Sequence, residues 1–152
     1  MKKWYLLLSI FSTLIVGCSK DDYLEDDSTG LPTPKANEIY YTTTDGLFID
    51  FSDKSWFNTS VTSHTVKNDS IFVLTFIKDL KEIEYEQFYE EDKLKSIKLP
   101  DGILKIGDGA FNGCKNLTTF TIPNSLINID SNPFFNVFRS PKQPKLFRNN
   151  QI

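Results

Sequence analysis

The chain has 152 residues, 39% of them hydrophobic, and a formal net charge of −3. This length holds one small domain, and the acidic balance does not favour nucleic acid as a partner, because phosphate binding requires a basic surface. With one histidine and two cysteines, no residue pattern supports a metal, a nucleotide or a covalent cofactor.

Residues 1–17 have the form of a secretory signal peptide. Lys2 and Lys3 precede residues 4–16, an uncharged run that is shorter than the roughly 20 apolar residues of a membrane span. The run ends at Gly17-Cys18, which resembles the lipobox of bacterial lipoproteins, where the cysteine becomes the lipid-modified first residue of the mature protein. We therefore expect lipidation of Cys18 and a membrane anchor; an ordinary cleaved signal peptide is the alternative.

Residues 18–36 are acidic and contain prolines, which predicts a solvated tether. The cluster Lys20, Asp21 and Asp22 also resembles the surface-export signal of Bacteroidota lipoproteins. This resemblance implies an outer-membrane lipoprotein exposed at the cell surface, and retention in the periplasm is the alternative. If Cys18 carries lipid, the other cysteine has no partner, so we expect no internal disulfide.

Residues 37–70 are predicted to form a β-rich N-terminal cap. Residues 37–44 are strand-like and lead into an Asp45-Gly46 turn, and residues 61–76 are strand-like on both sides of a turn at residues 67–69. The sole histidine, His64, falls in this region. We interpret it as structural, because no nucleophile lies in a recognisable turn.

Six apolar columns recur at an interval of 23 residues within residues 71–139. Every position in them is large and apolar, and the columns are Ile71, Leu94 and Leu117; Leu74, Ile97 and Phe120; Phe76, Leu99 and Ile122; Leu80, Ile103 and Leu126; Ile83, Ile106 and Ile129; Phe88, Phe111 and Phe134. A repeat of this length buries its apolar side only by stacking on copies of itself. The periodicity predicts a β-rich repeat solenoid of about three 23-residue units, with Leu99 directly beside both Phe76 and Ile122.

The middle unit carries a specific motif. It reads Leu94-x-x-Ile97-x-Leu99-Pro100-x-x-Ile103-x-x-Ile106-Gly107-x-x-Ala110-Phe111-x-x-Cys114 and closely resembles the BspA-like leucine-rich repeat. The first unit departs from the motif, with Ile77 in place of the proline and Gln87 in place of the alanine. The resemblance covers roughly residues 37–139. It implies a leucine-rich-repeat fold typical of surface binders and adhesins, and it brings no catalytic residues.

We therefore expect a surface-displayed binding module for adhesion or ligand recognition, without enzymatic activity. Polar residues that alternate with the inward ones on the strands are predicted to form an exposed binding face: Thr75, Ser96, Lys98, Thr119 and Thr121. The expected partners are a host protein or a glycan. A glycan-binding accessory lipoprotein is one alternative, favoured if the aromatic residues of the cap region are exposed: Tyr40, Tyr41, Trp56 and Phe57. A truncated remnant of a larger adhesin is another.

Two groups near the first unit carry no chemistry in this interpretation. Glu90, Glu91 and Asp92 are expected to form a solvated turn, because they lack the spaced oxygen ligands of a calcium loop. Tyr85 and Tyr89 are four residues apart and are expected to pack on one side of a short helical turn rather than to stack on a sugar.

Residues 140–152 are basic, and we expect them to lack regular structure. Ser140 stands where the next unit should have its leucine, and Pro141 and Pro144 follow. The last unit is therefore predicted to end without a cap and to offer an open edge for self-association.

Overall fold

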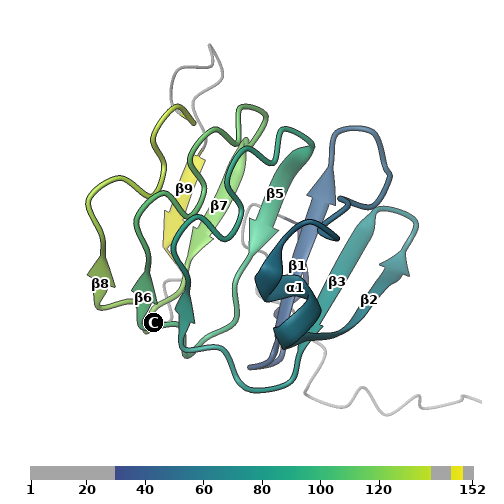
Figure 1. Cartoon of the computed structure of the whole chain (residues 1–152), viewed down its shortest axis with the longest axis horizontal. Helices are drawn as coiled ribbons and strands as arrows, with labels where there is room; N and C mark the ends of the chain where they lie inside the picture. The colour runs from purple at the N-terminus through teal and green to yellow at the C-terminus, as the bar shows by residue number, and fades with distance from the viewer. Residues whose placement is uncertain (1–29, 138–144, 149–152) are drawn as a thin grey trace, which may run out of the picture.

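The computed structural model describes residues 30–137 and 145–148, which form two facing sheets joined by repeated loops (Figure 1). Within these residues the larger sheet has the strand order β2-β3-β1-β5-β7-β9 and the smaller sheet the order β4-β6-β8. The strands of the larger sheet are β1 (Glu38–Thr43), β2 (Val61–Asn68), β3 (Ile71–Phe76), β5 (Leu94–Lys98), β7 (Thr119–Ile122) and β9 (Lys145–Arg148). Those of the smaller sheet are β4 (Glu82–Ile83), β6 (Lys105–Ile106) and β8 (Asn128–Ile129).

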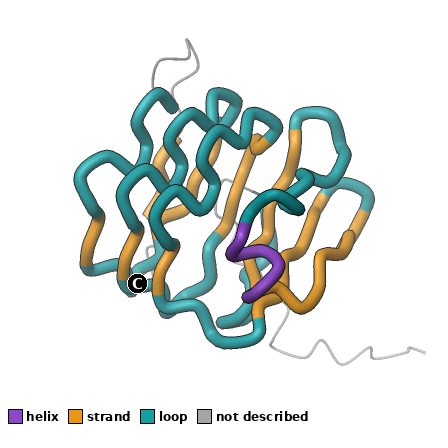
Figure 2. The backbone as a smooth tube through the Cα atoms, viewed as in Figure 1, coloured by secondary structure: helices purple, strands orange, loops and turns teal. Residues whose placement is uncertain are grey.

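The repeat register is confirmed where parallel strands pair. In the larger sheet, Ile97 of β5 pairs with Phe120 of β7. In the smaller sheet, Ile83 of β4 pairs with Ile106 of β6, and Ile106 pairs with Ile129 of β8. Partners in these pairs are separated by the 23 residues of the sequence repeat. The loops that connect the two sheets consequently follow one another as similar, adjacent runs (Figure 2).

The N-terminal end of the larger sheet departs from the repeat. A strand is confirmed within residues 37–44, but β1 lies between β3 and β5 and is antiparallel to both. Ile39 pairs with Leu74 of β3, and Tyr41 pairs with Ile97 of β5. The prediction that the first and second units pair directly, with Phe76 beside Leu99, is therefore wrong. Their facing strand edges bond to β1 instead.

The C-terminal end also departs from prediction. β9 is parallel to β7, with Thr119 opposite Lys145 and Phe120 opposite Leu146, a spacing of 26 residues rather than 23. The expectation of irregular structure is therefore wrong at Lys145–Arg148, and β7 does not present the open edge that we predicted. Both prolines of the tail precede β9 in sequence, so neither removes a hydrogen-bond donor from it. Residues 138–144 and 149–152 lie outside the described residues.

The core lies between the two sheets and contains most of the repeated apolar columns. Leu94, Ile97 and Phe120 are fully buried, whereas Ile129, in the last unit, is 48% exposed. Phe111 stacks between Phe88 and Phe134, with ring centroids 5.3 Å away on each side and interplanar angles of 3° and 6°. This aromatic stack runs through all three predicted units and joins them to one another.

Helix α1 (Ser55–Ser60) leads directly into β2 and lies in front of the larger sheet in the view of Figure 1. Its Trp56 and Phe57 are partly buried against the core. Within the described part of the chain, no helix has the length and apolar character needed to cross a membrane.

Cys114 is a buried core residue, as the repeat pattern implied. It is fully shielded from solvent, and its thiol donates a hydrogen bond to the Phe88 carbonyl oxygen, with 2.9 Å between Sγ and O. Burial raises the pKa of the Cys114 thiol to about 12. The thiolate is therefore not populated near neutral pH, and the side chain has a packing role.

Candidate functional site: a groove on the turn face

The predicted binding face on the larger sheet is mostly covered. Ser96, Lys98 and Thr121 are at most 7% exposed, whereas Thr75 and Thr119 are partly exposed. The polar alternation on the strands therefore does not produce the open polar ladder that we expected.

The cover over this face includes residues that we assigned to the tether. Leu31 and Pro34 are buried, and the Lys98 ammonium group donates a hydrogen bond to the Leu31 carbonyl oxygen, with 3.0 Å between Nζ and O. Leu31 also belongs to a small apolar cluster whose other members lie on β1 and β3: Tyr40, Ile71 and Val73. The outer face of the sheet carries apolar residues there, so it binds a segment of its own chain.

The aromatic residues expected to favour a glycan are also not exposed as a cluster. Tyr40 is 4% exposed and Tyr41 is fully buried. Trp56 stacks on Phe76 at 6.1 Å, and Phe57 packs against Phe51 at 5.7 Å. Tyr41, Trp56 and Phe57 therefore serve the core, and Tyr40 serves the small outer cluster with Leu31, rather than a sugar platform.

His64 has a structural environment. It lies on β2, half-buried and close to the rings of Phe48, Phe51 and Phe57. The Ile49 N–H donates to the Tyr41 hydroxyl oxygen, so we assign the Tyr41 O–H as the donor to His64 Nε2. Burial lowers the pKa of His64, and burial raises the pKa of Tyr41. In the described residues no group of three or more His, Cys, Asp or Glu side chains lies close enough to hold a metal ion.

Glu91 does not belong to a solvated turn, which corrects our interpretation of the acidic triple. Its side chain is 13% exposed and lies 3.6 Å from the Lys54 ammonium group. Burial raises the pKa of Glu91 to about 6, against the opposing charge of Lys54. Lys54 also donates to the Tyr89 carbonyl oxygen, so these contacts join the start of α1 to the first repeat turn.

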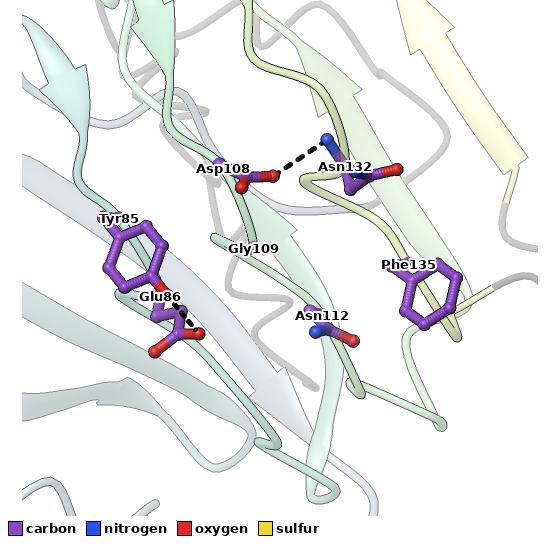
Figure 3. A pocket seen from close by; sticks show the side chains of 7 residues that line it. All are labelled: Tyr85, Glu86, Asp108, Gly109, Asn112, Asn132 and Phe135. Carbon is purple, nitrogen blue, oxygen red and sulfur yellow. Dashed lines mark hydrogen bonds between the residues drawn. The ribbon is translucent and has the colours of Figure 1, made fainter.

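The described surface has a groove on the turn face, which is formed by the turns that follow β4, β6 and β8. It has a volume of about 250 Å³. The residues that line it, all drawn in Figure 3, are Tyr85, Glu86, Asp108, Gly109, Asn112, Asn132 and Phe135. Tyr85 and Phe135 stand at opposite ends, with the polar residues between them (Figure 3).

The groove exists because equivalent positions of the three units differ in size. Glu86, Gly109 and Asn132 are successive members of one 23-residue column, and the middle member has no side chain. Gly109 has a φ of +65°, and a Cβ atom there would lie 3.0 Å from Cγ of Glu86. Glycine therefore permits both the turn and the passage of the Glu86 side chain across the floor.

Two hydrogen bonds hold the walls of the groove. The Tyr85 hydroxyl donates to Oε1 of Glu86 at 2.8 Å, and the Asn132 backbone N–H donates to Oδ1 of Asp108 at 3.0 Å. The first of these bonds raises the pKa of Tyr85. The positions of both carboxylates are thus set by partners from the groove itself.

The groove combines hydrogen-bonding groups with exposed rings. Tyr85 is 66% exposed and Phe135 is 51% exposed, so our expectation that Tyr85 serves only packing is wrong. Asn112 and Asn132 add side-chain amides between these rings. The lining therefore offers carboxylates, amides and aromatic rings, and it contains no serine, cysteine or histidine.

Sequence comparison places the repeat turns in a known family. The family model of the BspA type leucine rich repeat region matches residues 49–142, in six copies. No curated protein and no solved structure matches the chain. The matched residues make up more than half of the chain and include every residue that lines the groove. The chain therefore belongs to the BspA type leucine-rich repeat family.

Proposed function

We propose that this protein is a lipid-anchored, surface-displayed recognition protein that binds a ligand without transforming it. The observation that carries the proposal is its membership of a family of non-catalytic repeats that suggests a binding module. The groove on the turn face supports it, because binding residues are often presented on loops held by a rigid scaffold.

The binding module in this proposal is a solenoid of three 23-residue units that begin near Ile71, Leu94 and Leu117. The strands β1 and β2 and the helix α1 would act as its N-terminal cap. Support comes from the 23-residue register of β4, β6 and β8 and of β5 with β7. The ligand would bind at the turn face, since the outer face of the larger sheet is already covered near Lys98.

The anchor and the surface display are supported by the sequence alone. Cys18 is the proposed lipid site, and Lys20, Asp21 and Asp22 the proposed export signal; all four lie outside the described residues. In the cell, Cys18→Ser should release the protein from membranes or stall precursor processing. A Cys18→Ser protein that still takes up labelled fatty acid would contradict the anchor.

Surface display has its own test. Protease added to whole cells should remove the protein, and replacing Lys20, Asp21 and Asp22 with alanine should protect it without lowering its total amount. Equal resistance of both versions would place the protein in the periplasm.

The recognition function is tested with the purified mature chain carrying Cys18→Ser. We would probe it on arrays of host matrix proteins and glycans, beside Tyr85→Ala and a control, Lys95→Ala, which changes an exposed β5 residue away from the groove. We expect a ligand whose capture fails with Tyr85→Ala and persists with Lys95→Ala. Equal capture by both variants would exclude the groove as the ligand site.

A further inference from the structure

We propose that the groove on the turn face is a carbohydrate subsite that holds one neutral sugar residue. This inference rests on the proposed function, because it names the ligand class of the same binding module. Four features carry it: the size of the groove, the position of its rings, the character of its free polar groups and its charge.

The size of the groove limits the ligand to one small ring. Its volume of about 250 Å³ lies below the roughly 300–1,000 Å³ of pockets for drug-sized molecules. It crosses three units, which at about 4.8 Å between neighbouring strands is a length of roughly 10 Å. The residues at both ends of the groove, Tyr85 and Phe135, are exposed to solvent, so the bound ring can be one residue of a longer chain.

The rings at the two ends present apolar surfaces. Tyr85 and Phe135 come from the first and the third unit and lie on either side of the polar residues (Figure 3). The hydrogen bond from Tyr85 to Glu86 helps to hold the hydroxyl end of the Tyr85 side chain in place. The C–H face of a pyranose ring can lie against such a ring while its hydroxyl groups point to the polar residues between them.

The polar groups between the rings suit hydroxyl groups, which both donate and accept hydrogen bonds. The Asn112 side-chain amide has no hydrogen-bond partner among the described residues, and Asn132 bonds to Asp108 through its backbone N–H. Each side-chain amide offers both a donor and an acceptor. Asp108 and Glu86 add carboxylate acceptors whose negative charge disfavours an anionic sugar.

A lysine or arginine side chain of a protein partner fits the groove less well. It would use the carboxylates and the rings, but it could not accept from the amide N–H groups of Asn112 and Asn132. The observations therefore favour a neutral sugar over a cationic side chain.

The test is a titration of the ¹⁵N-labelled mature chain, carrying Cys18→Ser, followed by NMR. The neutral probes are glucose, galactose, mannose and N-acetylglucosamine. Glucuronic acid is the anionic probe, and acetyl-lysine-amide, acetylated on the α-amino group so that the side chain keeps its charge, is the cationic one. We expect at least one neutral sugar to shift backbone signals of residues 85–86, 108–112 and 132–135 at millimolar concentration. The Asn112→Ala and Tyr85→Ala variants should bind that sugar about tenfold or more weakly than the parent chain. Lys95→Ala should bind it with the parent's affinity.

Each outcome decides the proposal. Tyr85 and Asn112 are both accessible to solvent, so neither alanine variant should lose stability. An unchanged melting temperature will confirm that each variant has folded. Signal changes with acetyl-lysine-amide or glucuronic acid but with no neutral sugar would overturn the carbohydrate assignment. If no probe shifts the groove while Tyr85→Ala still abolishes capture of a matrix protein, the carbohydrate inference fails and the recognition function stands. If no probe shifts the groove signals and no array ligand depends on Tyr85, both the carbohydrate inference and the recognition function fail.

Discussion

The two ends of the larger sheet carry the same apolar spacing but differ in strand order. At the C-terminal end, where the repeat units pair in parallel, Ile97 and Phe120 are buried and pair with each other. At the N-terminal end Leu74 is equally buried, but it pairs with Ile39 of β1 rather than with Ile97. An apolar column therefore indicates which face of a strand is buried and does not identify the neighbouring strand.

The two ends also differ in whether their loops place equivalent residues side by side. Parallel units place equivalent turn residues side by side, so a small residue in one unit leaves a hollow between larger ones, as Gly109 does between Glu86 and Asn132. The antiparallel strands β2, β3 and β1 have no equivalent turns in register. The repeated end is thus the part of the fold in which differences between equivalent turn residues shape a groove.

The largest expected effect tests the continuity of the stack. Phe111→Ala removes a fully buried ring that packs between Phe88 and Phe134, and it should destabilise the protein by about 3–5 kcal/mol. Urea unfolding measures the change. The matched control is Phe135→Ala, an exposed ring of the same repeat region, for which a change within about 0.5 kcal/mol is expected. Similar losses for both variants would show that the units do not share a core through Phe111.

A smaller effect is expected on the covered face of the sheet. Lys98→Met keeps the aliphatic stem but removes the ammonium donor to the Leu31 carbonyl oxygen, which should cost about 1.5–3 kcal/mol. Amide hydrogen exchange should also become faster at Leu31 and Thr33, the two residues of this segment that carry an N–H. The exposed Lys95 on the same strand provides the control Lys95→Met. Unchanged stability and exchange in Lys98→Met would mean that this face is open to solvent.

The contact of Glu91 with Lys54, between the first repeat turn and the start of α1, should make the stability of the protein depend on pH. Burial raises the pKa of Glu91 to about 6, above its unfolded value near 4.5, so the folded state holds this proton to higher pH. The stability from this group is full below pH 4.5 and is lost as the pH rises through 6, by about 2 kcal/mol in total. In Glu91→Gln the carboxyl group is replaced by an amide that does not titrate, so this variant serves as the reference. The parent's unfolding free energy minus that of Glu91→Gln should therefore fall between pH 4.5 and 7, and a flat difference would contradict the burial.

The 23-residue columns were sufficient to predict the parallel register, because a unit of this length cannot bury its apolar side alone. They were not sufficient to place β1, since residues 37–44 lie outside the repeat and any open strand edge could accept them. Alternation placed Ser96 and Lys98 on the outer side of β5, and the Lys98 side chain does reach Leu31 of the small outer cluster. It could not show that Leu31 covers Lys98, because this contact joins residues 67 positions apart.

The groove could have been found from the sequence by comparing the units where they differ. Tyr85 with Asp108, and Asn112 with Phe135, are equivalent positions of neighbouring units that differ in size and polarity. The apolar columns contain the positions at which the units agree, and these form the core. The positions at which the units differ lie on the turn face, where packing does not constrain the residue type.

Cysteine cross-linking tests the central claim about the fold most directly. Thr42 pairs with Ser96 across β1 and β5, which places their Cα atoms at about 4.5–5.5 Å, within disulfide range. Val73 is the residue 23 positions before Ser96, and with β1 between them its strand lies about 10 Å away. In a Cys18→Ser background, Thr42→Cys with Ser96→Cys should form an intramolecular disulfide on mild oxidation, and Val73→Cys with Ser96→Cys should not. A disulfide in the second pair and none in the first would show that the first unit pairs directly with the second.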